Sequence, residues 1–188
     1  ITVYDIKSDK YPAFAELGVN CADSVEQAVA ASEVILLAVK PQDYETVLCG
    51  IKDAVAGQKK IFISIAAAIS TSYICKTLGA DFPVVRVMPN TPLLIGCGAT
   101  AISRNTAVDD RLYTKICGLF AASGSVVSLP EEQMNAVISV NSSSPAYVYL
   151  FAKAMIDNAV EQGIEHDVAK DLVFQTLKGA AEMLIHSK

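Results

Sequence analysis

The stretch Val34-Ile35-Leu36-Leu37-Ala38-Val39-Lys40-Pro41 decides the fold, because an unbroken apolar run ends there on a cation and a proline. A short run without polar residues is typical of a strand that is buried on both faces, as strands of parallel sheets are. A helical pattern follows from about Asp43 to Val55, Gly57 ends it, and Ile61–Ile65 is the next apolar run. The stretch therefore predicts a β-α-β unit, whose crossover is expected to be right-handed.

The same alternation continues outward from this unit in both directions. N-terminal to it, strands are predicted at Ile1–Tyr4 and Val19–Cys21, and helices at Tyr11–Leu17 and Val25–Ala31. C-terminal to it, the pattern predicts further elements at Ser70–Leu78, Val84–Met88, Ala99–Ser103, Asp109–Ala122 and Ser125–Leu129. Strands separated by helices of this length are typical of a doubly wound α/β sheet with helices on both faces. We therefore predict one sheet domain over residues 1–129.

The pattern changes after Pro130, where strand-like runs give way to helical periods. The predicted helices cover Glu131–Val140, Pro145–Gln162 and Asp167–Ser187, so residues 130–188 form a second, all-α unit. The last of these helices carries apolar residues on overlapping faces, namely Leu172, Leu177, Ala180, Ala181, Leu184 and Ile185. A short helical tail cannot bury so many apolar residues by itself, so we expect a second copy of the chain to cover them. The alternative is that they pack back on the sheet domain.

The composition is 52% hydrophobic and 19% charged over 188 residues, with a formal net charge of −5 and a mean hydropathy of +0.38. It excludes a disordered chain, and an acidic balance without a basic run argues against a nucleic-acid partner. The longest uncharged apolar stretch, Ile61–Cys75, is shorter than the ~18–20 residues of a membrane span, so no membrane partner is predicted. The five cysteines lack metal-ligand spacing, which predicts no metal site and favours free thiols in a cytoplasmic protein.

The N-terminus shows no targeting segment, and the chain opens directly on a strand-like run at Ile1. This opening suggests that the chain is a piece of something longer.

Candidate binding residues follow the predicted strands, because an open parallel sheet binds ligands outside the carboxyl ends of its strands. Asp5 ends the first strand, where a carboxylate could reach the hydroxyls of an adenosine ribose or could simply form a turn. Lys7 and Lys10 follow, and they could instead hold a ribose 2′-phosphate. Lys40 and Pro41 leave the central strand as a cation and a rigid turn, which we expect to touch a cofactor.

Two further strand ends carry small or rigidly presented residues. Ile65–Ser70 contains three alanines, which either let a flat ring lie against the backbone or permit close helix-sheet packing. In Met88–Pro92, two prolines bracket Asn90 and Thr91, side chains that can orient a carboxamide or a bound water. Gly96–Ala101 matches the dinucleotide pattern GxGxxG/A, but it follows a proline-rich loop and runs into no helix. We therefore predict that a true phosphate-binding glycine loop would precede Ile1.

Three motifs together resemble pyrroline-5-carboxylate reductase: Ala38-Val39-Lys40-Pro41, Arg86-Val87-Met88-Pro89-Asn90-Thr91-Pro92 and Ser143-Ser144-Pro145-Ala146-Tyr147. The resemblance extends over essentially the whole chain. It implies reduction of the cyclic imine of pyrroline-5-carboxylate to L-proline by NADPH or NADH, the last step of proline biosynthesis. It also implies a Rossmann domain at 1–129, a helical dimerisation domain at 130–188, and a homodimer or larger homo-oligomer.

The resemblance also implies which residues meet the ligands. The cofactor is expected near Asp5, Ser24, Ala38, Val39, Lys40, Pro41, Ala66, Ala67, Asn90 and Thr91, and the substrate near Ser143 and Ser144. No catalytic side chain is assigned, because imine reduction relies mainly on positioning the hydride against the carbon. The chain departs from the family in lacking the first strand and its glycine-rich turn, in lacking a Ser-Pro-Gly-Gly-Thr-Thr-like helix start expected after Lys188, and in having Ser142 where glycine is usual.

Two other hypotheses remain open at this stage. One is a related Rossmann reductase acting on another imine or a hydroxyacid, for which Lys153 is the candidate proton donor in the interdomain helix. The other is a non-catalytic module that binds a dinucleotide or only dimerises. A glycine-rich turn upstream and a Ser-Pro-Gly-Gly segment downstream would favour the pyrroline-5-carboxylate reductase.

Overall fold

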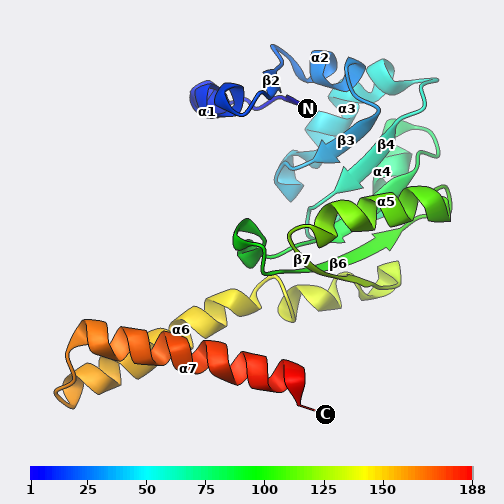
Figure 1. Ribbon diagram of the computed structural model, residues 1–188. Coiled ribbons are helices and arrows are strands. Elements are labelled where there is room, and N and C mark those ends of the chain that lie inside the picture. The colour runs from blue at the N-terminus through cyan, green and yellow to red at the C-terminus, as the bar shows by residue number, and fades with distance from the viewer. Residues whose placement is uncertain (188) are drawn as a thin grey trace. The chain divides into compact units, whose positions relative to one another are not determined.

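Five strands form the central sheet in a computed structural model, which describes residues 1–187 (Figure 1). Their order is β3-β4-β5-β6-β7, with bounds Val34–Leu37, Ile61–Ser64, Val84–Met88, Gly98–Arg104 and Gly124–Ser128. Strands β3, β4 and β5 are parallel, whereas β6 is antiparallel to β5 and β7 is parallel to β6. Strands β1 (Thr2–Val3) and β2 (Asn20–Cys21) pair in a separate parallel sheet.

Helices cover both faces of the central sheet, as the sequence predicts. Helices α2 (Val25–Ala30), α3 (Tyr44–Val55) and α4 (Thr71–Leu78) pack on one face, in a core that includes Leu48 and Phe62. Helix α5 (Asp110–Ala121) packs on the other face, against residues such as Val85 and Ile102. Helix α1 (Tyr11–Glu16) contacts β2 beside the smaller sheet. The doubly wound α/β architecture is thereby confirmed.

Side-chain caps fix the starts of these helices where the sequence predicts them. The backbone N–H groups of Gln27, Tyr73 and Leu112 donate to the side chains of Ser24, Ser70 and Asp109, which begin α2, α4 and α5. One cap was not foreseen: the buried Lys60 Nζ donates to the carbonyls of Val29 and Ser32 at the end of α2. Carbonyls at a helix end have no partner within the helix, so a cation there stabilises it.

Strand β3 corrects one sequence expectation, that it is buried on both faces. Ile35 and Leu37 are buried beneath the helices, but Val34 is 45% exposed and Leu36 is 53% exposed. Helix α5 covers the face of β4, β5 and β6, and among the described residues no helix covers the corresponding face of β3. Contacts within the described residues therefore bury only one of the two faces of this apolar strand.

The segment after Pro130 corrects a second expectation, because Glu131–Val140 is not an α-helix. It forms two 3₁₀ turns, Glu131–Gln133 and Ala136–Ser139. The chain bends between them, so that Glu131 and Asn135 both reach Arg86 on β5 and Met134 is fully buried. These tertiary contacts outweigh the helical period of the sequence.

Two long helices, α6 (Ser144–Glu161) and α7 (His166–His186), form a hairpin. The compact units of the chain meet between Ser142 and Ser143, and the predicted domain boundary at residue 130 stays a prediction. The hairpin has a small core of Ala152, Ile156, Ala169 and Val173. None of the helices among residues 1–187 is long and apolar enough to cross a membrane.

Candidate functional site

The candidate site is the edge of the central sheet where β3, β4 and β5 end. Because these strands are parallel and adjacent, their carboxyl ends meet at one edge. The predicted cofactor residues Ala38, Val39, Lys40 and Pro41 leave β3 there, Ala66 and Ala67 leave β4, and Asn90 and Thr91 leave β5. The fold therefore brings three sequence-predicted groups together at the place where open α/β sheets bind ligands.

The β3 exit is short and exposed. Ala38, Lys40 and Pro41 are exposed and Val39 is half-buried. A 3₁₀ turn over Pro41–Asp43 follows, in which the Asp43 N–H donates to the Lys40 carbonyl at 2.9 Å. Lys40 thus presents a cation at the surface directly beyond the strand.

The β4 exit is made of small residues, of which two show the packing role considered from the sequence, while the contact with a flat ring stays a prediction. Ala66 is buried in the core beneath the helices, and Ala67 packs against the cluster around Met88. Ala68 is exposed and has a φ of +63°, the only positive φ outside glycine in the part of the chain that the structure describes. Non-glycine residues in this region are strained, and such residues cluster at functional sites.

The β5 exit is held by a pair of asparagines. The Asn90 Oδ1 accepts the Ala99 N–H at 2.9 Å, and its Nδ2 donates to the Asn141 carbonyl at 3.2 Å. The buried Asn141 Nδ2 donates to the carbonyls of Met88 and Ala99, at 2.7 and 2.9 Å. Asn90 is thereby fixed beside the exposed Thr91. Sequence reasoning did not place Asn141 at this site, since its partners lie more than forty residues away.

Asp5 and Ser24 lie beside the smaller sheet and use their side chains locally. The Asp5 Oδ1 accepts the Lys7 N–H at 2.8 Å, and Ser24 caps α2. The turn-forming role that the sequence allowed for Asp5 is therefore present, which leaves its predicted ribose contact as a proposal.

Ser143 and Ser144 open the helical unit. Ser143 is the residue before α6 and Ser144 is its first residue, with Pro145 in the first turn, where proline suits a helix. Both serines are half-buried.

The glycine-rich match at Gly96–Ala101 has a packing role. Gly98 begins β6 and pairs with Gly124 of β7. A Cβ on Gly98 would lie 2.9 Å from the Ser123 carbonyl oxygen, and a Cβ on Gly124 would lie 2.1 Å from that of Gly98. These glycines allow two strands to approach closely, and the segment continues as a strand rather than as a phosphate-binding helix.

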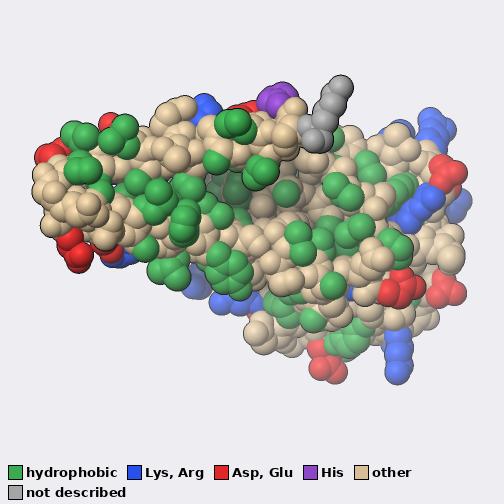
Figure 2. Space-filling view, turned by 90° about the horizontal axis from the view of Figure 1, so that it is seen from below, with side chains coloured by type: hydrophobic (Ala, Val, Ile, Leu, Met, Phe, Trp, Pro, Cys, Tyr) green, Lys and Arg blue, Asp and Glu red, His purple; other side chains and the backbone are tan. Residues whose placement is uncertain are grey.

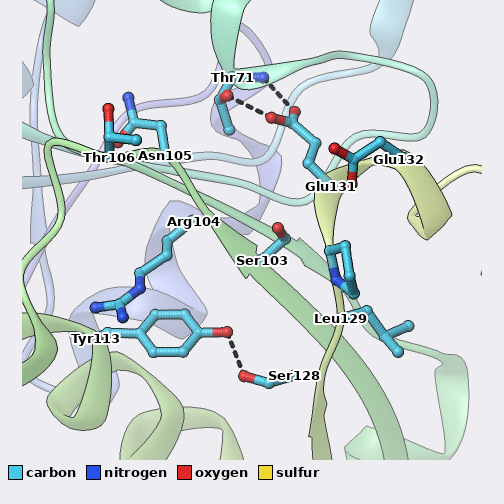
Figure 3. A pocket seen from close by; sticks show the side chains of 11 residues that line it. Thr71, Ser103, Arg104, Asn105, Thr106, Tyr113, Ser128, Leu129, Glu131 and Glu132 are labelled. Atoms are coloured by element: carbon cyan, nitrogen blue, oxygen red, sulfur yellow. Dashed lines mark hydrogen bonds between the residues drawn. The ribbon is translucent and has the colours of Figure 1, made fainter.

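A polar hollow of about 690 Å³ lies elsewhere, at the far end of β6 (Figure 3). Arg104 sits 4.5 Å from the centre of the Tyr113 ring and pairs with Asp110, and the Tyr113 hydroxyl contacts Ser128. Arg104 pairs with Val85 at the start of β5, so this hollow is at the opposite end of that strand from Asn90. Two of its charged groups already have partners, Arg104 with Asp110 and Glu131 with Arg86, and none of the predicted site residues lines the hollow.

The Glu131 carboxylate connects the segment after Pro130 to helix α4 and to the sheet. Sequence reasoning missed this feature. It accepts from the Thr71 N–H at 2.7 Å and from the Thr71 hydroxyl at 2.6 Å, at the start of α4 (Figure 3). It also lies 3.9 Å from the buried Arg86 guanidinium, whose Nη2 donates to Asn135. Burial lowers the pKa of Arg86, and the Glu131 charge opposes this shift. The network anchors residues 131–141 on the sheet.

This architecture, a doubly wound sheet with its small and polar residues at the carboxyl ends of parallel strands, is that of the Rossmann-type oxidoreductases. Two family profiles agree: residues 2–68 match "NADP oxidoreductase coenzyme F420-dependent", and residues 131–188 match "Pyrroline-5-carboxylate reductase dimerisation".

Curated relatives and a solved structure narrow the assignment. The chain is 36% identical over 177 residues to a pyrroline-5-carboxylate reductase of Mycobacterium tuberculosis, covering 92% of this chain and 59% of the relative. It is 31% identical to that of Escherichia coli, covering 100% of this chain and 70% of the relative. The Plasmodium falciparum pyrroline carboxylate reductase with NADP bound superposes with a TM-score of 0.89 at 29% identity, over 100% of this chain and 68% of that one. The chain belongs to the pyrroline-5-carboxylate reductase family.

Proposed function

We propose that the whole protein containing this chain reduces 1-pyrroline-5-carboxylate to L-proline with NADPH, or with NADH, as the hydride donor. The observation that carries the proposal is the identity to pyrroline-5-carboxylate reductases along the entire chain. The proposal concerns the whole protein, because the chain spans only 59% of the length of the Mycobacterium tuberculosis relative.

The residues at the sheet edge fit part of a nicotinamide dinucleotide. Ala67 and Ala68 leave the backbone at the β4 exit uncovered by long side chains, and Lys40 offers a cation nearby in the fold. Within residues 1–187, no glycine-rich turn joins a strand to a helix, so the donors for the pyrophosphate would come from outside this chain. Both cofactors fit these residues: Lys7 and Lys10 are exposed beyond β1, where they could hold the 2′-phosphate of NADPH, and the Asp5 carboxylate accepts one backbone hydrogen bond but could still accept from a ribose hydroxyl of NADH.

The reaction requires little acid-base chemistry from the protein. A nicotinamide cofactor held at the strand ends would supply a hydride to the carbon of the protonated imine; the double-bond electrons would pass to the nitrogen, which would keep its proton. The strand-end residues hold the reactants in position, and positioning accounts for most of the acceleration. We place the substrate near Ser143 and Ser144.

We propose that another segment of the whole protein covers the open face of β3. Leu36 and Val34 expose apolar side chains on that face. The edge of β3 is open as well, because β3 has a strand neighbour on only one side among the described residues. Strand β1 belongs to a separate sheet, so one further parallel strand could join the two sheets. The greater length of the relatives supports this proposal.

A second copy of the chain is the proposed partner of the helical hairpin. Hydrophobic side chains gather over α6 and α7 (Figure 2), and Leu150, Phe151, Leu172 and Leu184 are each more than half exposed. A groove of about 510 Å³ on the hairpin is lined by Tyr149, Ala152, Ile156 and Phe174 together with Lys153, Asp157 and His166. Such a surface is typical of a homodimer interface, and symmetric dimers are the commonest assemblies.

We place the protein in the cytoplasm. Its five cysteines are all free thiols, which is the state expected in a reducing compartment.

The alternative of a related reductase with a lysine proton donor finds little support. The Lys153 ammonium is 70% exposed and pairs with Asp157 one turn later on the same helix. An exposed ion pair of this kind is an ordinary surface feature.

The test is a spectrophotometric assay of the whole protein. Pyrroline-5-carboxylate should cause loss of nicotinamide absorbance with NADPH or NADH, and the absence of any substrate-dependent loss with either cofactor would overturn the proposal. The 188-residue chain assayed alone should be nearly inactive, because it lacks the donors for the pyrophosphate.

A further inference from the structure

Beneath the candidate site lies a buried pair of hydroxyl groups that none of the roles described above uses. Tyr44, the first residue of α3, is 1% exposed, and Ser64, the last residue of β4, is fully buried. The Tyr44 hydroxyl lies 2.9 Å from the Leu37 carbonyl oxygen and 2.8 Å from the Ser64 hydroxyl. Leu37 and Ser64 are register partners at the ends of β3 and β4. The pair therefore lies where the two strands end.

The direction of every hydrogen bond in this group follows from the number of protons available. The Leu37 carbonyl can only accept, so the single Tyr44 hydroxyl proton is donated to it. The Ser64 hydroxyl must then donate to the Tyr44 oxygen. The Ser64 oxygen is left to accept from the Ala66 N–H, at a long 3.5 Å. The result is one chain of hydrogen bonds from Ala66 through Ser64 and Tyr44 to Leu37.

This chain of hydrogen bonds reinforces the sheet ladder at the point where the ladder weakens. The next ladder bond, from the Ile65 N–H to the same Leu37 carbonyl, is already stretched to 3.4 Å. Tyr44 supplies the short bond to that carbonyl and so closes the β3 exit, residues 38–43, at both ends. Burial raises the pKa of the Tyr44 hydroxyl, which keeps it protonated as a donor. Ser64 connects the same group to the β4 exit.

The β4 exit also carries the strained Ala68, with a φ of +63°. A strained residue persists only when its surroundings hold it in place. The fixed end of β4 at Ser64, Ile65 and Ala66 is one such restraint, and the Ser70 cap of α4 is the other.

We propose that Tyr44 and Ser64 are positioning residues that hold the β3 and β4 exits in the arrangement that binds the cofactor. This inference rests on the proposed function, because it assigns these two exits to the cofactor. Without the chain of hydrogen bonds, the exits would adopt the binding arrangement for a smaller fraction of the time, and the affinity would fall by that fraction.

The experiment compares Tyr44→Phe and Ser64→Ala with a matched control, Tyr113→Phe, in the full-length protein. Tyr113 also donates its hydroxyl proton to a strand carbonyl, that of Ile102, but it does so from helix α5, on the opposite face of the sheet from Tyr44. Tyr44→Phe should raise the NADPH Kd by about five- to tenfold with kcat changed much less, as expected for loss of one buried hydrogen bond. Tyr113→Phe should leave the NADPH Kd unchanged. The double variant Tyr44→Phe/Ser64→Ala should have an NADPH Kd no higher than that of the weaker-binding single variant, because both changes break the same chain of hydrogen bonds.

Wild-type affinity in Tyr44→Phe, or equal weakening in Tyr113→Phe, would overturn the inference. Hydrogen exchange of the full-length protein without cofactor gives a second readout: the Ile65 and Ala66 amides should exchange faster in Tyr44→Phe, and unchanged exchange would refute the hydrogen-bond chain. If the wild-type protein fails to bind NADPH, the proposed function fails, and the exchange result still decides about the chain of hydrogen bonds.

Discussion

Ala68 is the residue whose backbone is least suited to its side chain, since its φ of +63° favours glycine. Ala68→Gly should relieve this strain at some cost in chain entropy and stabilise the fold by about 0.5–1 kcal/mol, which raises Tm by a few degrees at most. Thermal unfolding measured by circular dichroism tests this. Ala67→Gly is the matched control and should destabilise, because the φ of Ala67 is not positive. Destabilisation by both variants would show that Ala68 is not strained.

Glu131 joins residues that lie far apart in the sequence. Glu131→Gln keeps the size of the side chain but removes its charge, so the α4 N-terminus loses an anion and the buried Arg86 loses its charged partner. We expect a loss of about 2–3 kcal/mol in the free energy of unfolding, measured in urea. Glu132→Gln, an exposed neighbour, should cost less than about 0.5 kcal/mol. If the two changes lower the free energy of unfolding equally, Glu131 does not anchor residues 131–141 on the sheet.

At the scale of whole elements, the open face of β3 distinguishes this chain from the whole protein. Leu36→Asp should hardly change the stability of the 188-residue chain, in which Leu36 is 53% exposed. In the whole protein the same change should lower the free energy of unfolding by about 3 kcal/mol or more, because it places a charge under the covering segment. Equal costs in the two proteins, measured by urea unfolding, would mean that nothing covers this face.

The elements themselves could be predicted from local patterns in the sequence. Helix starts at Ser24, Ser70 and Asp109 follow from capping chemistry, and the apolar runs predict the strands of the sheet. The helix expected at Glu131–Val140 was wrong because Arg86 and Thr71 draw that segment onto the sheet. Local patterns carry no information about such partners.

The candidate site, too, could be predicted only in part from the sequence. The strand ends could be located, since parallel strands place their exits together. The contacts that hold these exits, Tyr44 with Ser64 and Asn90 with Asn141, join residues 20 and 51 positions apart and required the fold.

At the scale of the whole molecule, the hairpin predicts association. Leu184 is 77% exposed on α7, so Leu184→Asp should place an unpaired charge in the interface and shift a dimer toward monomer. Leu177 packs within the hairpin core instead, so Leu177→Asp should unfold the hairpin. Leu119→Asp on α5, 64% exposed, is the control and should leave the sedimentation coefficient unchanged. A wild-type protein that sediments as a compact monomer at micromolar concentration would contradict the dimer.

The central claim, imine reduction by a nicotinamide cofactor, is tested most directly by following the hydride. The whole protein is incubated with pyrroline-5-carboxylate and NADPH deuterated at the transferable position of the nicotinamide, and the product is analysed by mass spectrometry and NMR. We expect L-proline that carries a single deuterium on the former imine carbon, because the reaction moves the hydride directly from cofactor to substrate. Unlabelled proline, or label that stays in the cofactor while no proline forms, would contradict the account.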